Sequence, residues 1–343
     1  MNREARFVRA ALRADILLLL TAAIWGFGFV AQRSGMEHIG PFAFNGIRFI
    51  LGSLFLLPII FFRRRRYTGK IASPRSLLFP SLAAGGCIFT AVLLQQFGIL
   101  FTTAGNAGFI TGLYVVFTPI FGIFLGRKTG PATWFGSILT FSGLYFLSVA
   151  GRPSVNPGDI IIIFSAVLWT IHVLLIDRFM NLEISGSSLD PVELSAGQFS
   201  VCGILMLLGA FLAEPYVIPI VERIDPALLS AGLFKWQPFP SLVSELWAGT
   251  MQISCEMAIP ILYGGICSVG IAYTLQVVAQ RDAPPAHATI ILCFEGCFAA
   301  IGGVLLLSEK AGAWTLLGFI FMLAGMLATQ WEVIAGKARQ QVN

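Results

Sequence analysis

Charged residues are scarce in this sequence. Only 11% of its 343 residues are Asp, Glu, Lys or Arg, whereas 57% are hydrophobic, and the mean hydropathy is +0.83. Because a soluble domain carries about 25% charged residues, the shortage excludes a sizeable soluble domain between the apolar segments. We therefore expect most of the chain to lie in lipid, and a net charge of +5 gives no reason to expect a nucleic-acid partner.

Motifs for metal binding, ATP hydrolysis and intramembrane catalysis are also missing. The six cysteines form no CxxC pair and no Cys/His cluster with zinc spacing, and Cys293 and Cys297 are interpreted as a buried helix face. The sequence has no GxxxxGK[ST] segment, no HExxH, no GxSG-like nucleophile paired with a membrane histidine and no pair of mid-span aspartates. These absences exclude a P-loop ATPase, and we expect no metal, no cofactor and no catalytic residue.

Apolar runs of membrane-spanning length are abundant. A helix needs about 20 apolar residues to cross the hydrocarbon core of a bilayer. Ten segments meet this requirement, near residues 14–33, 42–62, 77–101, 105–127, 132–150, 159–179, 191–213, 257–279, 284–307 and 311–332. Pro41 and Pro191 suit the first turn of two of them, and Asp190 can cap the exposed amides of the second. The sequence predicts an all-α integral membrane protein with ten transmembrane helices.

The two halves of the sequence resemble each other. DILLLLTAAIWG from Asp15 matches DIIIIFSAVLWT from Asp159, and Trp25 and Trp169 take the same place in each. Further matches pair Leu125–Gly130 with Leu307–Gly312, and Gly136 and Gly143 with Gly318 and Gly325. Each half holds five runs, an odd number, so the halves are expected to cross the membrane in opposite directions as inverted repeats.

This duplication predicts two five-helix repeats, at 14–150 and 159–332. The second contains an additional outer loop at 214–256, within which 241–253 could form a short surface helix. Two interpretations of the loop remain open, a tolerated insertion and a lid over the substrate. A pseudo-symmetric pair of repeats can form a complete path alone, so a monomer suffices, and a homodimer is the alternative.

Lysine and arginine are distributed unequally along the predicted topology. With the N-terminus inside, sixteen of the 22 basic residues fall in cytoplasmic segments and five in outer ones, while Arg48 lies within a span. The positive-inside rule then places both termini in the cytoplasm. The run Arg63–Arg66 is either a stop-transfer anchor or a site for anionic lipid.

Seven polar or aromatic side chains inside the spans are candidates for binding a substrate. They are Trp25, Arg48, Gln95, Gln96, Trp169, His172 and Glu295. Ionisable groups in a bilayer cost about 3 kcal/mol on insertion scales, which makes them functional candidates. Glu295, near the middle of its run, could exchange a proton or face a substrate amine, or it could be a neutral acid bonded between helices. Arg48 could bind a substrate carboxylate, or it could hold backbone carbonyls or reach the interface.

The remaining candidates also have two interpretations each. His172 could relay protons or be a hydrogen-bonded core histidine. Gln95 and Gln96 could bind both ends of a zwitterion or connect helices. Trp25 and Trp169 could line a cavity from both halves or anchor their helices at the interface.

Four stretches carry a resemblance to a known family. They are AIWGFGF at Ala23–Phe29, GPFAFNGIRF at Gly40–Phe49, the segment Thr102–Pro119 and the segment Phe294–Lys310. With the order of ten runs and the duplicated half, they resemble the drug/metabolite transporter superfamily, in particular its EamA-domain branch. The sequence departs from the family pattern at Gly296, where proline is usual, and at Ser308, where glycine is usual. The resemblance implies a secondary carrier of small metabolites, commonly an exporter, in a bacterial inner membrane.

The sequence therefore favours a secondary transporter of small organic metabolites such as amino acids, with protons as the candidate coupling ion. Phosphorylated cargo is disfavoured because, away from their ends, the predicted spans contain no lysine and one arginine, Arg48. A receptor or scaffold with a transporter fold is the alternative, and an intramembrane enzyme, whose motifs are missing, comes third.

Overall fold

The computed structural model describes residues 3–36, 39–66, 74–101, 104–127, 129–148, 157–184, 187–224, 239–248, 255–307 and 312–340. The helices in this part of the chain are α1 (Arg3–Gly35), α2 (Pro41–Arg66), α3 (Pro74–Phe101), α4 (Ala104–Thr111), α5 (Tyr114–Phe124), α6 (Pro131–Ser148), α7 (Pro157–Met180), α8 (Pro191–Leu212), α9 (Glu214–Ile224), α11 (Phe239–Trp247), α12 (Cys255–Leu262), the π-helix η1 (Tyr263–Tyr273), α13 (Thr274–Ala279), α14 (Pro285–Leu292), α15 (Glu295–Leu307) and α16 (Ala313–Gln340). A two-residue strand β1 (Glu183–Ile184) pairs antiparallel with β2 (Ser187–Ser188).

Proline begins six of these helices, because its fixed φ suits the first turn and its missing N–H has no helical partner there. Seven helical segments of the described residues are long and apolar enough to cross a membrane: Arg9–Gly35, Pro41–Arg65, Arg75–Phe101, Pro157–Met180, Pro191–Leu212, Cys255–Ala279 and Pro285–Gly302. Two shorter apolar helical stretches are Tyr114–Phe124 and Leu316–Thr329. The chain is therefore a multi-pass, all-helical membrane protein apart from the short β1–β2 hairpin.

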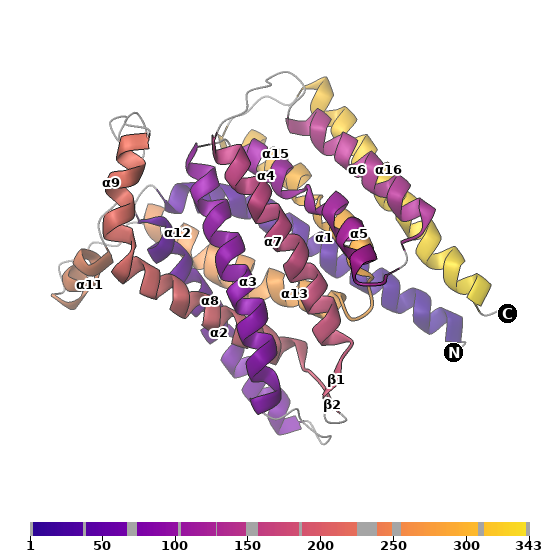
Figure 1. Cartoon of the computed structure of the whole chain (residues 1–343), viewed down its shortest axis with the longest axis horizontal. Helices are drawn as coiled ribbons and strands as arrows, with labels where there is room; N and C mark the ends of the chain where they lie inside the picture. The colour runs from indigo at the N-terminus through magenta and orange to yellow at the C-terminus, as the bar shows by residue number, and fades with distance from the viewer. Residues whose placement is uncertain are drawn as a thin grey trace.

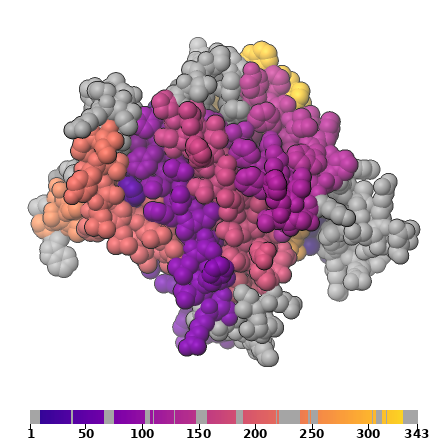
Figure 2. Space-filling model, in the orientation of Figure 1, coloured from indigo at the N-terminus to yellow at the C-terminus, as the bar shows by residue number. Residues whose placement is uncertain are grey.

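Apolar side chains cover the surface of the bundle. Figure 2 shows α3, α7 and α8 on one face. Phe79, Phe164 and Ile204 on these helices are 70%, 62% and 53% exposed. A soluble protein rarely exposes contiguous apolar area of this kind, so this face is suited to lipid.

Helices distant in sequence lie side by side. Figure 1 shows α6 and α16 along one side of the molecule and α9 and α11 on the other. The matched glycines of the two halves bring α6 and α16 together, since a Cβ on Gly136 would lie 2.7 Å from the Gly325 carbonyl oxygen and one on Gly143 would lie 2.7 Å from that of Gly318. Small residues thus allow backbone-to-backbone packing where lipid offers no hydrophobic drive.

Two of the predicted spans are interrupted. The run at 105–127 is divided into α4 and α5 at Gly112–Leu113, and the run at 284–307 into α14 and α15 at Cys293–Phe294. Glu295 is therefore the first residue of a half-helix and not a mid-helix residue. At both interruptions the backbone makes i→i+3 hydrogen bonds, from Leu113 N–H to the Ile110 carbonyl (3.1 Å) and from Gly296 N–H to the Cys293 carbonyl (3.1 Å). These bonds tighten the turns, so the second interruption forms without the proline usual in the family.

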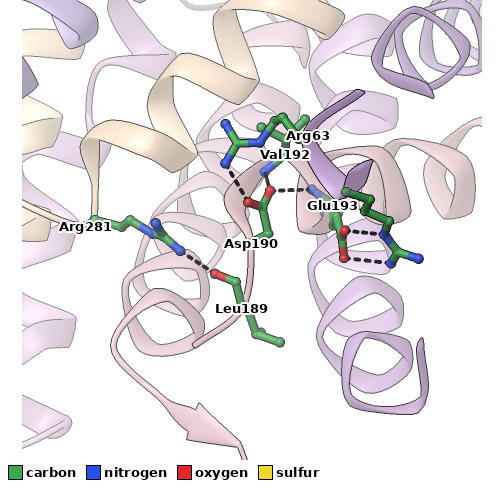
Figure 3. A network of polar contacts seen from close by, with 7 residues as sticks. Arg63, Leu189, Asp190, Val192, Glu193 and Arg281 are labelled. Carbon is green, nitrogen blue, oxygen red and sulfur yellow. Dashed lines mark hydrogen bonds and ion pairs between the residues drawn. The ribbon is translucent and has the colours of Figure 1, made fainter. Parts of the chain in front are cut away.

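The end of the bundle that carries the β1–β2 hairpin, the hairpin end, is held by ion pairs. Figure 3 shows Asp190, which accepts from Arg63 (2.7 Å) and from the amides of Val192 (2.8 Å) and Glu193 (3.2 Å). Asp190 therefore caps α8, as the sequence predicts, while it also binds the end of α2. Arg64 makes two bonds to Glu193, at 2.6 and 3.0 Å. At least two arginines of the 63–66 run thus join the two halves of the chain.

An arginine–aspartate ion pair and a histidine–aspartate contact also cross between the halves at the hairpin end. Gly126, with a φ of 74°, turns the chain after α5, and the next residue, Arg127, binds Asp177 of α7. His287 Nε2 lies 2.8 Å from Asp15 Oδ1 and connects α14 to α1. These contacts close the hairpin end beneath the centre of the bundle.

Glu214 holds the opposite end of α2. Its Oε1 accepts hydrogen bonds from the amides of Phe42 (3.0 Å) and Ala43 (3.3 Å), in the first turn of that helix. A carboxylate at a helix N-terminus satisfies free amides and is favoured by the helix dipole. Gly40 leaves the space, since a Cβ there would lie 2.0 Å from Oε1. Burial raises the pKa of Glu214 to about 7, although the two amide bonds act in the opposite direction.

Glu214→Gln is expected to remove the contribution of Glu214 to the pH dependence of the unfolding free energy. The pKa rises from an ordinary value of 4.5 to about 7 on folding, so the folded protein binds this proton more tightly than the unfolded chain. The stabilisation is full below the unfolded pKa and is lost as the pH rises through the folded pKa. As the pH rises through this range, the unfolding free energy of the wild-type protein should fall by about 3 kcal/mol at most relative to that of the variant. Thermal unfolding from pH 4.5 to 8 measures this difference, and parallel profiles for the two proteins would contradict it.

The described parts of the 214–256 loop pack on α8. The rings of Phe211 and Phe239 lie 4.9 Å apart, and Phe239 and Leu242 of α11 are buried. The predicted surface helix at 241–253 corresponds to α11, which begins and ends earlier, while 249–253 lie outside the described residues.

Candidate functional site

A cavity lies at the centre of the bundle. It contains about 530 Å³ of space not filled by atoms, with the open solvent at its mouth included. Its lining comes from both halves of the chain and comprises Trp25, Phe29, Gln32, Arg48, Gln95, Thr111, Tyr114, Trp169, Val173, Ser268, Tyr273, Gln276, Leu292 and Glu295.

The two interrupted helices meet at this cavity. Tyr114, the first residue of α5, donates its hydroxyl to Glu295 Oε1 at 3.0 Å, and Glu295 is the first residue of α15. The thiol of Cys293 donates to the Gly112 carbonyl at 3.4 Å, which joins the two interruptions a second time. Among the described residues, Glu295 Oε2 makes no hydrogen bond. This oxygen can therefore accept from a bound solute or carry a proton.

Helix α1 packs directly against α15 beside this contact. A Cβ on Gly26 would lie 2.4 Å from the Phe298 Cβ and 2.7 Å from the Glu295 carbonyl oxygen. Trp25 directly precedes Gly26 in the chain. The close contact at Gly26 therefore places Glu295 beside Trp25. Packing here sets the position of the carboxyl group.

Three aromatic rings form a wall of the cavity. Tyr273 lies 4.5 Å from Trp25 and 5.8 Å from Trp169 between ring centroids, and the Trp169 contact is stacked. The indole N–H groups are both satisfied, by the Ser268 carbonyl for Trp25 (3.3 Å) and by Gln95 Oε1 for Trp169 (2.7 Å). Because rings and N–H groups are held, the wall is preorganised, and it offers apolar faces to a solute.

The π-helix η1 positions part of this wall. Its sequence, YGGICSVGIAY, is rich in glycine, and it runs for 11 residues, although π-helices are rare and usually a single turn. Besides the contacts that Trp25 makes, two further hydrogen bonds join it to α1: Thr21 Oγ1 donates to the Ala272 carbonyl (3.1 Å), and Tyr263 donates to the Ile24 carbonyl (2.8 Å). These hydrogen bonds hold η1 against α1, so the π-helix presents Ser268 and Tyr273 to the cavity.

Arg48 enters the cavity from α2. It is 2% exposed, and its guanidinium carbon lies 5.6 Å from the centroid of Phe44 and 5.2 Å from that of Phe49. The backbone of η1 comes close to its stem, since a Cβ on Gly264 would lie 3.3 Å from Arg48 Cδ. No hydrogen bond or ion pair joins Arg48 to another of the described residues.

Five of the seven predicted site residues line this cavity: Trp25, Arg48, Gln95, Trp169 and Glu295. Gln96 and His172 are buried but lie outside the lining. His172 Nε2 lies 3.1 Å from Gln198 Oε1, and neither polar atom of the Gln96 side chain has a partner. The structure therefore assembles the two tryptophans, the arginine, the glutamate and one of the two glutamines.

Sequence reasoning missed several polar or aromatic lining residues. They are Phe29, Gln32, Thr111, Tyr114, Ser268, Tyr273 and Gln276. Tyr114 follows Gly112–Leu113 directly, so a glycine two residues before a tyrosine inside an apolar run was one available signal. The glycines of 263–273 were another, since they mark close approach of a second backbone. None of the described residues of 214–256 lines the cavity.

A central cavity between two interrupted helices, inside a multi-pass helical membrane protein, is the form of a solute carrier's binding site. The chain belongs to the EamA-like transporter family, whose model matches residues 12–149 and again residues 156–330. The family and the names of the relatives indicate a membrane transporter and not an enzyme.

Relatives of similar length carry the same description. The chain is 27% identical to an uncharacterized transporter of Archaeoglobus fulgidus over 87% of this chain and 79% of the relative. It is 20% identical to the uncharacterized transporter YoaV of Bacillus subtilis over 90% and 94%. It is 24% identical to the uncharacterized inner membrane transporter YedA of Escherichia coli over 61% and 74%.

A solved crystal structure has the same fold. It matches 96% of this chain and 99% of its own, with a TM-score of 0.68 at 16% sequence identity. At that identity the likeness concerns the fold alone.

Proposed function

We propose that the protein is a secondary transporter that moves a small organic metabolite across a bacterial inner membrane by alternating access. The observation that carries this proposal is the contact of Tyr114 with Glu295, which brings the two interrupted helices together in a cavity lined by both halves. Interrupted helices at matching positions of two repeats mark the substrate site in carriers.

The proposed architecture has ten spans in two inverted repeats, at 14–150 and 159–332. Two matches to one family model, at 12–149 and 156–330, support it. So do the interruptions, which fall in the fourth predicted span of each half. The excess of basic residues assigns the hairpin end and both termini to the cytoplasm. A monomer contains the whole cavity, and a homodimer is the alternative.

Alternating access requires the cytoplasmic end to open. Trp25, Phe29 and Gln32 line the cavity on successive turns of α1 that lead away from the hairpin end. The hairpin end itself is held by polar contacts between the halves, among them the Arg127–Asp177 ion pair and the His287–Asp15 contact. We propose that these pairs separate when the cavity opens to the cytoplasm.

Glu295 is the proposed coupling residue. It is 4% exposed, and it lines the cavity beside Tyr114. A carboxyl group there can bind a proton in one state and release it in another, or it can face a substrate amine. Amino acids are the first cargo to test, because the cavity combines one acid, one arginine, amides and aromatic rings. Export is the proposed direction.

Entrance counterflow tests the function without any assumed gradient. Liposomes containing the purified protein are loaded with one unlabelled amino acid at a time and then exposed to a trace of the labelled form. A carrier produces a transient accumulation of label that protein-free liposomes lack. A receptor or scaffold with the same fold would bind solute without this accumulation.

Removal of residues 226–237 is expected to leave counterflow within about twofold of the full chain, since insertions outside a binding site tolerate changes in length. The physical reason is that none of the described residues of the 214–256 loop lines the cavity. Flux that disappears while the shortened protein keeps its thermal stability would instead identify the loop as a lid.

A further inference from the structure

Arg48 is buried, and its guanidinium has no hydrogen-bond or ion-pair partner among the described residues. Four other arginines of the described chain each bind an oxygen: Arg63 binds Asp190, Arg64 binds Glu193, Arg127 binds Asp177 and Arg281 binds the Leu189 carbonyl. Those four lie at the hairpin end and are partly or largely exposed. Arg48, by contrast, is 2% exposed and its Nε has no hydrogen-bond partner.

The surroundings of Arg48 supply no opposite charge. Its identified neighbours are the rings of Phe44 and Phe49, Gly264, Tyr273 and Cys202. The rings attract a cation and support the plane of the guanidinium, but they carry no net charge. Glu295 is the one acidic residue in the lining, and it lies beyond ion-pair distance.

The unpartnered group faces the cavity together with two others. Thr111 and Gln276 line the cavity, and Thr111 Oγ1 and Gln276 Oε1 are buried without a hydrogen-bond partner among the described residues. Buried polar groups are normally satisfied, and an unpaired buried cation is among the most costly of them. A cavity that holds three such groups has the donors and the acceptor that an oxygen-bearing solute would satisfy.

We propose that Arg48 binds the carboxylate of the transported solute, so that the cargo is an organic acid or a zwitterion and not an amine or an uncharged compound. This inference rests on the proposed function, since it concerns the cargo of the same cavity. The guanidinium fork matches a carboxylate in two parallel N–H···O bonds. One arginine does not neutralise a phosphate dianion, so a phosphate ligand is disfavoured. Chloride is the alternative anion that could bind Arg48.

Thermal stability tests the unpartnered charge without knowledge of the cargo. In ligand-free protein, Arg48→Met keeps the apolar stem and removes the charge, so Tm should rise by about 5 °C. The control Arg33→Met removes an exposed arginine outside the lining and should leave Tm unchanged. A lower Tm for Arg48→Met would show that Arg48 is a structural group and would overturn the proposal.

Anion binding is then measured as a ligand-induced rise in Tm of the wild-type protein. The probes are the twenty amino acids, their carboxamides, the matching carboxylic acids that lack the amine, and sodium chloride. At least one carboxylate should raise Tm by several degrees while its amide does not, and Arg48→Met should abolish the rise. Equal effects of an acid and its amide, an effect of chloride alone, or no effect of any carboxylate would each overturn the assignment.

These readouts separate the inference from the proposed function. Thermal shifts require binding and no flux. If carboxylates bind through Arg48 but no counterflow is seen, the carboxylate site is supported and the transport function is contradicted. If a solute shows counterflow and Arg48→Met transports it with unchanged affinity, the transport function is supported and the carboxylate site is contradicted.

Discussion

Glu295→Gln should retain solute exchange and lose all dependence on a pH gradient. The amide can still accept a hydrogen bond from Tyr114, as Glu295 Oε1 does at 3.0 Å, so the contact between α5 and α15 survives. It cannot bind or release a proton. With one proton per solute, a gradient of one pH unit sustains an accumulation ratio of about tenfold. We expect that ratio for the wild-type protein in liposomes and a ratio of about one for the variant.

The control for this experiment is Glu193→Gln. Glu193 binds Arg64 at the hairpin end and lies outside the cavity lining, so its loss should leave the accumulation ratio at the wild-type value. If Glu295→Gln also kept the full ratio, Glu295 would have no part in coupling. Its carboxyl would then serve as a hydrogen-bond acceptor between helices or as the partner of a substrate amine.

Gly26→Ala should destabilise the protein by about 1–3 kcal/mol, the usual cost of overpacking, and should stop most transport. The new Cβ would lie 2.4 Å from the Phe298 Cβ, 2.7 Å from the Glu295 carbonyl oxygen and 2.8 Å from the Ala299 amide nitrogen. Two of these atoms belong to the backbone, which cannot move aside as a flexible side chain can. Separation of α1 from α15 would displace Glu295 from Tyr114 and widen the interface between the two halves of the chain.

Gly86→Ala is the matched control. Gly86 lies inside α3, and a Cβ there would meet nothing within 4 Å. Alanine favours the helix, so this variant should be unchanged or more stable by up to about 1 kcal/mol. Thermal unfolding and counterflow of the two variants distinguish the effects. Equal stability of the two proteins would show that α1 can move away from α15 at little cost.

The sequence was sufficient for the class of protein and for many helix ends. Low charge and long apolar runs predict membrane helices, and prolines 41 and 191 with Asp190 mark two of the starts that the structure shows. The pairing of Trp25 with Trp169 in the duplicated halves predicts residues that approach each other. Both line one cavity with Tyr273 between them.

The interruptions could not be predicted from hydropathy. Neither Gly112–Leu113 nor Cys293–Phe294 contains a proline, and a broken helix and a continuous one have the same composition there. The contact that defines the site joins Tyr114 to Glu295, 181 positions apart. Local patterns carry no information on such a pairing.

The direction of each side chain around its helix was also inaccessible. In a soluble helix, hydrophobic periodicity separates the core face from the solvent face. In a membrane helix both lipid and protein neighbours are apolar, so periodicity is weak. Gln95 and Gln96 show the consequence, because adjacent glutamines looked equivalent in sequence and only Gln95 lines the cavity. His172, one turn from Trp169, likewise contacts Gln198 outside the lining.

Efflux of a panel of labelled amino acids from liposomes that contain the purified protein tests the central claim most directly. The measurement is made with and without an imposed pH gradient. We predict saturable efflux of at least one member, faster when the gradient favours proton exchange. If no member moves under either condition, while the protein remains folded and binds carboxylates, the account of this protein as a proton-coupled amino-acid carrier is contradicted.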